Sequence, residues 1–168
     1  MKTTFRKVAT YVFAFLAICS SSISVEAACN TGEYLHQSSG VYEAKTGLMW
    51  QKCSVGQEGI ACKGKPKLMT VPQAVEYAAQ FSAKNPGWRL PTVDELSTLL
   101  QAKCVEPKIN QFVFPNSLSV ATWTSTTNDG SGFLVVDLAN GYIDPVNLNT
   151  PKAVRLVKVI KAVKAVTK

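Results

Sequence analysis

The chain has 168 residues, of which 46% are hydrophobic and 17% charged, and its formal net charge is +7. It contains no internal repeat and no low-complexity linker, so its length suits one domain that can bury a core. The basic balance permits weak attraction to acidic polysaccharide, lipid headgroups or nucleic acid, but it identifies none of them.

Residues 1–27 have the three-part build of a secretory signal. Lys2, Arg6 and Lys7 give it a positive start, and the apolar run Val8–Cys19 follows. That run is too short for a membrane anchor, because a span takes about 20 apolar residues. We therefore expect cleavage after Ala27, export to the periplasm or the cell surface, and no transmembrane segment afterwards.

The residues around the expected cleavage site disfavour a lipid anchor. Glu26 lies three places before Cys29, where a lipoprotein signal needs a Leu-like residue. Losing residues 1–27 removes three basic residues and one acidic residue, which leaves a net charge of +5. Export also argues against nucleic acid as a partner.

Four cysteines remain after the expected signal, and an even number in a small exported domain is typical of two disulfides. Three pairings are open, and the sequence does not choose among them. Loop geometry favours Cys53–Cys62 across a polar loop and Cys29–Cys104 tying the N-terminus to the centre. Each bridge would stabilise the fold by about 2–4 kcal/mol. The separations lack the paired C-x2-C spacing of zinc sites, so we expect no metal.

The first half of the chain predicts a hairpin, a loop and a helix. Val41–Gln51 has the pattern of a hairpin with its turn at Lys45–Gly47. Cys53–Lys67 is a loop rich in glycine and lysine. A helix is predicted over Val71–Ala83, with Thr70 as its cap. Its apolar face would consist of Ala74, Tyr77, Ala78 and Phe81.

A second helix is predicted after the extended segment Trp88–Thr92. Thr92 and Glu95 have the spacing of a capping box, in which the hydroxyl accepts from the N–H of Glu95 and the carboxylate reaches back. We expect the helix to end before Cys104. Its apolar stripe would be Leu96, Leu99 and Leu100.

After Pro107 the pattern becomes that of β-strands. Asn140-Gly141 is a strong hairpin signal, and Pro145 places the strand that follows at a sheet edge or a bulge. Two helices with strands before and after them indicate an α+β domain. The predicted strands are Ala121–Ser125, Phe133–Leu138, Tyr142–Asn147 and Ala153–Ile160.

Several short sequence motifs follow one another along the chain: VYEAKTGLMWQKC, AVEYA, GWRLPTVDEL, the pair Phe114-Pro115, WTST and VRLVK. Together they resemble the Lcl C-terminal domain family, C-type-lectin-like modules of bacterial exported proteins, from about Val41 to Val159. The resemblance implies a C-type-lectin-like α+β fold with two helices packed on a twisted antiparallel sheet, to which the cysteine count adds two disulfides. We expect residues 28–40 to be a lead-in, 41–160 the domain and 161–168 a Lys-rich tail.

The resemblance also implies a binding role, since the namesake module belongs to a bacterial surface adhesin associated with sulphated glycosaminoglycans. We expect a lectin-like, adhesin-type module that contacts a glycan or another polyanion. The alternative is a structural or assembly partner of an envelope or surface protein. The calcium-binding tripeptides of sugar lectins are replaced here by Glu106-Pro107-Lys108 and Trp123-Thr124-Ser125, so calcium-mediated sugar binding is not expected.

The residues give no catalytic constellation, and we expect neither an enzyme nor a cofactor. The redox cysteine pair of the related formylglycine-generating enzymes is not carried over, because no cysteine follows Cys104. His36 is the only histidine and is predicted in an exposed loop. Glu95 is explained by capping, and Arg89 is expected to bridge backbone carbonyls or a carboxylate. Three tryptophans are predicted in the core rather than on sugar rings: Trp50, Trp88 and Trp123.

Lysines and one loop are the candidate binding residues. A lysine cluster after Cys62 and another at the C-terminus could meet sulphates or phosphates, although such runs are also typical of solvated segments. In the fold that the resemblance implies, loops near Trp123 form the ligand face. The polyanion candidates are Lys63, Lys65, Lys67, Lys158, Lys161 and Lys164, and the ligand-loop candidates are Asn128, Asp129 and Ser131.

Overall fold

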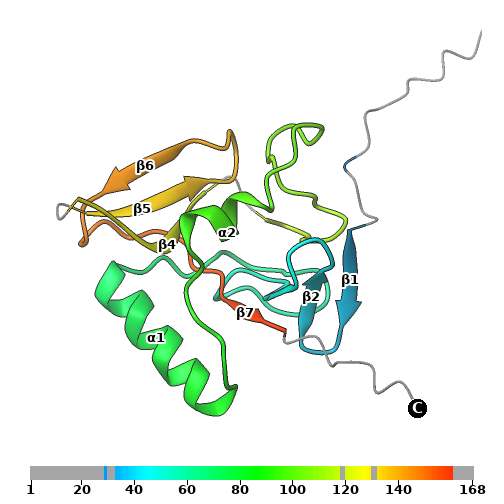
Figure 1. The fold of residues 1–168 in the computed structure, drawn as a ribbon, viewed down its shortest axis with the longest axis horizontal. Helices are drawn as coiled ribbons and strands as arrows, with labels where there is room; N and C mark the ends of the chain where they lie inside the picture. The colour runs from blue at the N-terminus through cyan, green and yellow to red at the C-terminus, as the bar shows by residue number, and fades with distance from the viewer. Residues whose placement is uncertain (1–28, 30–32, 118–119, 130–131, 161–168) are drawn as a thin grey trace, which may run out of the picture.

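A computed structural model describes residues 29, 33–117, 120–129 and 132–160 (Figure 1). The expected signal peptide and the expected C-terminal tail lie outside the described residues, as do Lys161, Lys164 and Ser131. Within the described part, no helix is long and apolar enough to cross a membrane. The chain forms an α+β domain, as predicted.

The first of two antiparallel sheets has four strands in the order β1-β2-β3-β7. The predicted hairpin is confirmed as β2 and β3, while β1 lies in the segment expected as a lead-in and extends the sheet by one strand. A Cβ on Gly40 would lie 2.2 Å from the carbonyl oxygen of Trp50, so only glycine fits at the start of β2. The strands are β1 Tyr34–Gln37, β2 Gly40–Glu43, β3 Leu48–Trp50 and β7 Val157–Val159.

The second sheet has three strands in the order β4-β5-β6. Figure 1 places it at the upper left, with β1 and β2 at the right and α2 between the two regions. The prediction of a single sheet is therefore wrong. β3 pairs with β7, and no strand of the first sheet pairs with β4. Pro145 lies in an edge strand, as predicted. The strands are β4 Ala121–Asn128, β5 Gly132–Asp137 and β6 Ile143–Val146.

The segment expected as a strand over Ala153–Ile160 is mostly not one, since only β7 pairs as a strand. Residues 153–157 are all 0% exposed, so the alternating pattern of a half-buried strand does not apply to them. The segment runs between two apolar clusters and contributes to both. Val157 packs with Trp50, Leu96 and Phe114, whereas Val154 and Leu156 pack with Met49, Trp88 and Trp123.

Helix α1 spans Val71–Lys84, close to its predicted bounds. The N–H of Thr70 donates to the side-chain oxygen of Gln73 at 3.0 Å, which closes the first turn. Ala74 and Ala78 are buried on the predicted apolar face. The larger side chains of that face are only partly buried, so they also form surface.

Helix α2 spans only Val93–Ser97, shorter than predicted. The capping box is confirmed: the N–H of Glu95 donates to the Thr92 hydroxyl at 3.1 Å, and the Glu95 carboxylate accepts from the Thr92 N–H at 2.8 Å. The chain then tightens, because the N–H of Leu100 bonds to the carbonyl of Ser97 three residues back. Leu100 forms a bridge with Ile109, so the chain beyond Ser97 does not continue as a helix.

Two disulfides join Cys29 to Cys104 and Cys53 to Cys62, the pairs that loop geometry favoured. The first spans 75 residues and ties the start of the described chain to the loop after α2. The second spans nine residues and closes the loop that follows β3. That loop forms part of the groove described next.

Candidate functional site

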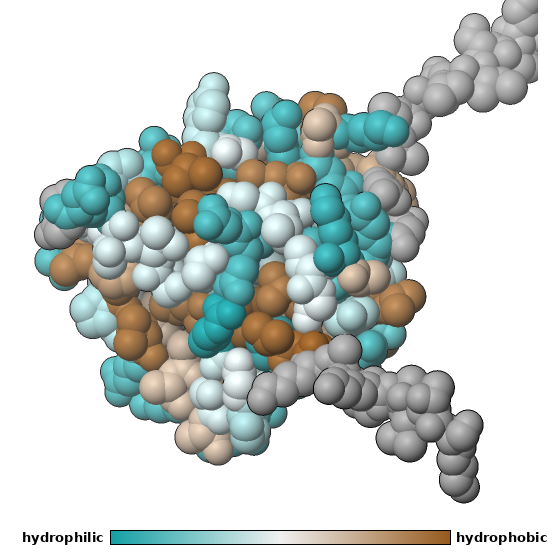
Figure 2. All heavy atoms as spheres, in the orientation of Figure 1, coloured by the Kyte–Doolittle hydropathy of each residue, from teal (hydrophilic) through white to brown (hydrophobic). Residues whose placement is uncertain are grey.

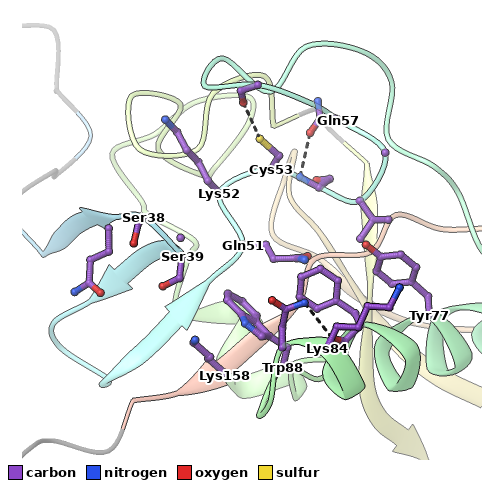
Figure 3. A pocket seen from close by; sticks show the side chains of 18 of the residues that line it. Ser38, Ser39, Gln51, Lys52, Cys53, Gln57, Tyr77, Lys84, Trp88 and Lys158 are labelled. Atoms are coloured by element: carbon purple, nitrogen blue, oxygen red, sulfur yellow. Dashed lines mark hydrogen bonds between the residues drawn. The ribbon is translucent and has the colours of Figure 1, made fainter.

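An open groove of about 970 Å³ lies between the β1–β2 turn, the segment after β3 and the C-terminal half of α1. Figure 3 shows Ser38 and Ser39 on one side of it and Lys52 and Cys53 on another. Tyr77 projects toward it from α1. Residues distant in the sequence therefore meet at this surface.

Aromatic rings form one side of the groove. Tyr77 and Phe81 lie one turn apart on α1 and stack with their centroids 6.0 Å apart, and Phe81 meets Trp88 edge to face at 6.1 Å. The Lys158 ammonium lies 5.0 Å from the centre of the Trp88 ring. Burial raises the pKa of the Tyr77 hydroxyl, while its hydrogen bond with the Gln51 side chain partly opposes this. Tyr77 is therefore a neutral hydrogen-bonding group at physiological pH.

The charge in the groove has one sign. Three lysines line it: Lys52 after β3, Lys84 near the end of α1 and Lys158 in β7. His36 adds an imidazole from β1. Among the described residues that line the groove, none is an aspartate or a glutamate. The charged side chains of the lining are therefore basic only.

The wall formed by residues 51–57 is fixed by the buried segment that precedes β7. The N–H of Gln51 donates to the carbonyl of Leu156 at 3.0 Å, and the Gln51 side chain accepts from the Leu156 N–H at the same distance. The N–H of Val55 donates to the carbonyl of Val154 at 2.8 Å. The Gln57 side chain accepts from the Ser54 N–H at 3.1 Å. This wall is therefore ordered by tertiary hydrogen bonds rather than by a helix or strand.

Arg155 lies behind the same wall and is 0% exposed. Its Nη1 donates to the carbonyl oxygens of Gln51 at 2.7 Å and Lys52 at 2.5 Å. Its Nη2 donates to the hydroxyls of Ser54 at 3.2 Å and Ser117 at 2.9 Å. Burial lowers the pKa of Arg155 to about 9, so the guanidinium stays protonated at neutral pH. Among the described residues it forms no ion pair with a carboxylate.

Of the predicted polyanion residues that the structure describes, only Lys158 lines the groove. Lys63, Lys65 and Lys67 are exposed, but none of them lines the groove. His36 was predicted in a loop, whereas it lies in β1 with an exposed side chain that lines the groove. The backbone of His36 pairs with Val41 of β2, which places the residue in a strand and not in a loop.

The ligand-loop candidates lie elsewhere. Asn128 ends β4, and Asp129 follows it as an exposed turn residue. Neither lines the groove. Sequence reasoning missed Tyr77 and Phe81 as site residues because it assigned them only to the core-facing side of α1. Their partial exposure depends on tertiary packing, which the sequence pattern does not reveal.

Arg89 and Glu95 form a two-pronged ion pair outside the groove lining. Arg89 Nη1 and Nη2 lie 2.7 and 2.6 Å from the two carboxylate oxygens, as expected of an arginine that bridges a carboxylate. The bond to Arg89 lowers the pKa of Glu95, and the bond to Glu95 raises the pKa of Arg89. All three tryptophans are buried, which confirms their assignment to the core.

The fold and the groove define a class of protein: a small disulfide-bonded α+β domain with an open, basic and partly aromatic surface groove. The family model of the Lcl C-terminal domain matches residues 39–158, and the chain belongs to that family. A comparison with curated proteins gave no match. Within the described residues, no three His, Cys, Asp or Glu side chains gather as a metal site would require.

Proposed function

We propose that this protein is an exported, C-type-lectin-like binding module that holds an anionic glycan in the groove, without calcium and without catalysing a reaction. The observation that carries the proposal is the combination of three lysines with three aromatic side chains in a groove whose described lining holds no acidic residue. The two disulfides support export, because such bonds persist in the periplasm and at cell surfaces.

The chemistry of the lining suits a sugar chain that carries negative groups. Tyr77 and Phe81 offer flat apolar surface to the faces of sugar rings. The exposed side-chain amides of Gln37 and Asn85 offer donors and acceptors for hydroxyls. The lysines meet carboxylates or sulphates. A volume of about 970 Å³ lies near the upper end of the range for small-ligand sites, so the groove has room for more than one sugar unit. The amides of Gln51 and Gln57 are instead bonded within the protein and hold the groove wall.

Two triple variants with the same loss of charge test the proposal. The first replaces the groove lysines by glutamine (Lys52→Gln, Lys84→Gln, Lys158→Gln), and the second replaces the exposed cluster (Lys63→Gln, Lys65→Gln, Lys67→Gln). Affinity for a size-defined heparin oligosaccharide, used as a probe of anionic glycans, is measured by calorimetry at several salt concentrations. We expect the groove variant to lose roughly tenfold or more, about 1.4 kcal/mol or more, and the cluster variant to bind like the wild type.

Each opposite result has a distinct meaning. Equal losses in both variants would show that the probe responds to net charge and not to the groove. Loss in the cluster variant alone would move the site to residues 63–67. A wild-type protein that binds the probe no better than an unrelated protein of equal pI would refute glycan binding.

A further inference from the structure

The two carbonyl groups that Arg155 binds belong to successive peptides of the groove wall. The carbonyl oxygens of Gln51 and Lys52 converge on a single nitrogen, Nη1 of Arg155. In a trans peptide the C=O and the next N–H point in opposite directions. The N–H groups of Lys52 and Cys53 therefore both point away from Arg155.

The side opposite Arg155 is the side of the groove. Residues 51–54 all line the groove, whereas Arg155 is wholly buried and does not line it. Figure 3 shows this segment at the groove rim, where Cys53 is held by its bond to Cys62 and the Lys52 side chain extends outward. Both N–H groups thus belong to a segment whose carbonyl groups are held by Arg155 on the buried side.

Neither N–H has a hydrogen-bond acceptor among residues 33–117, 120–129 and 132–160. Their neighbours are all satisfied: the N–H groups of Gln51, Ser54 and Val55 donate to a backbone or side-chain oxygen. Two adjacent N–H groups without acceptors that both point away from Arg155 are placed to donate to the same anion, as successive N–H groups of a turn can. The N–H of Gly56 also lacks an acceptor in the described residues, so what distinguishes Lys52 and Cys53 from the rest of the wall is that their unpaired donors are adjacent.

We infer that the backbone N–H groups of Lys52 and Cys53 form the anchor for one oxyanion of the ligand, a carboxylate, sulphate or phosphate group. This inference rests on the proposed function and specifies which part of the groove holds the charged group. Arg155 is the positioning residue: its guanidinium holds both carbonyls and thereby aims both N–H groups. Its unpaired positive charge also lies directly behind the donors, where it strengthens their attraction for an anion.

This positioning role gives a reason for burying the Arg155 guanidinium, although burying a charge costs free energy. A wholly buried guanidinium that forms no ion pair with a described carboxylate is unfavourable unless its donors are bonded. Four of its five N–H donors can serve the contacts described above, and Nε has no partner in the described residues. An apolar residue would fill the same space at lower cost but would leave the two peptides free to turn.

The test is a nuclear magnetic resonance titration of the disulfide-bonded, 15N-labelled protein with inorganic sulphate, inorganic phosphate, acetate and a heparin oligosaccharide. A backbone N–H that donates to an anion moves downfield in its proton shift. We expect the amide peaks of Lys52 and Cys53 to move downfield and to saturate, more than the peaks of residues 63–67. The simple anions show which oxyanion the anchor prefers, and the oligosaccharide shows whether a glycan uses it.

Two variants separate the backbone from the side chains. Lys52→Met removes the ammonium but keeps both N–H groups, so the two peaks should still move, with affinity lowered by less than about tenfold. Arg155→Lys keeps a charge but loses the planar fork, so it should abolish the selective shifts if the protein folds. If that variant does not fold, the titrations of the wild type and of Lys52→Met decide the matter.

The outcomes distinguish this inference from the function on which it rests. If the oligosaccharide binds in the groove and the peaks of Lys52 and Cys53 stay fixed, the anchor is refuted and the proposed function stands. If simple anions move both peaks but no glycan binds, the anchor is supported and glycan binding is refuted. Shifts spread evenly over all lysine-bearing segments would refute the anchor.

Discussion

Glu43 is a second buried charged side chain, with an exposed fraction of only 1%. Its Oε2 accepts from the Thr46 hydroxyl at 2.7 Å, from Trp50 Nε1 at 3.0 Å and from the Thr98 hydroxyl at 2.9 Å. Within the described chain it forms no ion pair, as is true of Arg155. Each charge is thus compensated by neutral donors or acceptors, which supply the hydrogen bonds that water would otherwise make.

The long-range contacts of Glu43 and Arg155 could not be predicted from the sequence. A pair such as Thr92 and Glu95 is readable from the sequence because both partners are three residues apart and the geometry is local. Arg155 contacts Gln51 and Lys52, more than a hundred residues earlier in the chain. No periodicity carries that information, so VRLVK predicts only an apolar strand with a basic residue in it.

We expect Glu95→Gln to lower the free energy of unfolding by about 1 kcal/mol at neutral pH. The amide of glutamine still accepts from the Thr92 N–H, so the variant mainly removes the ion pair with Arg89. The effect is modest because the Arg89 side chain is 43% exposed and its charge is screened by solvent. Urea unfolding of both proteins measures the difference, with Glu76→Gln as a control on an exposed face of α1.

The pH dependence has a definite sign. The folded protein holds the pKa of Glu95 below its ordinary value, chiefly through the bond to Arg89. The stabilisation is therefore present in full above the ordinary carboxyl range and is lost as the pH falls through the lowered pKa. The difference between wild type and Glu95→Gln should vanish at acid pH. A difference that stays constant with pH would mean that capping, not the ion pair, sets the effect.

At the scale of elements, the sequence predicts what local patterns determine. The β2–β3 hairpin, α1, the start of α2 and the edge position of β6 all follow from turn residues, caps and proline. The length of α2 and the pairing of residues 153–160 do not, because both depend on distant partners. Thr98 illustrates this: its hydroxyl lies within hydrogen-bond distance of the Glu95 carbonyl in its own turn and of the Glu43 carboxylate across the fold, and its one proton serves either acceptor.

The candidate groove is also an assembly of elements. Its lining comes from the β1–β2 turn, the 51–60 segment, α1 and β7, and only Lys158 was among the predicted binding residues. Lysine clusters in the sequence indicated a polyanion site by local density. The structure instead gathers single lysines from three separate segments, a pattern without any sequence signature.

We expect removal of one disulfide to affect mainly stability and removal of the other to affect mainly binding. In the chain-entropy relation, the Cys29–Cys104 bridge over 75 residues stabilises by about 4–5 kcal/mol and the Cys53–Cys62 bridge over nine by about 2–3 kcal/mol. We therefore expect the double variant Cys29→Ala/Cys104→Ala to lose more free energy of unfolding. The double variant Cys53→Ala/Cys62→Ala should lose more affinity for the heparin probe, because that bridge holds the groove wall.

Urea unfolding and calorimetric titration of the same two variants provide the check. Each variant is the control for the other, since both lack one bridge and keep the second. If the Cys29–Cys104 variant loses the larger share of binding, the groove wall does not depend on the short bridge. If the two stabilities fall in the opposite order, strain or residual structure outweighs loop length.

Some apolar side chains lie at the surface of the second sheet. Figure 2 shows hydrophobic residues at the surface over β6 and β5, at the upper left of the view. Tyr142 and Ile143 at the start of β6 are 69% and 47% exposed. Asp144 and Pro145 follow directly, and a charge and a proline in an edge strand discourage pairing with another chain. The exposed apolar residues here therefore belong to a strand edge that is protected against addition.

The two sheets share no strand, yet we expect them to unfold together. The buried segment 153–157 links them: Ala153 exchanges hydrogen bonds with β4, and Val157 pairs in β7 of the first sheet. Leu156, wholly buried, packs in the cluster that holds Met49 of β3 and Trp123 of β4. Loss of this segment would remove buried side chains from both hydrophobic clusters.

Leu156→Ala should therefore lower the free energy of unfolding by about 2–5 kcal/mol for the molecule as a whole. Far-ultraviolet circular dichroism and native-state hydrogen exchange, read separately for amides of β2 and β5, should show equal losses and coincident transitions. Val75→Ala, on an exposed position of α1, is the control and should change little. If exchange in β2 were unaffected while β5 opened, each sheet would be stable by itself, and the link through residues 153–157 would be mechanical contact without thermodynamic coupling.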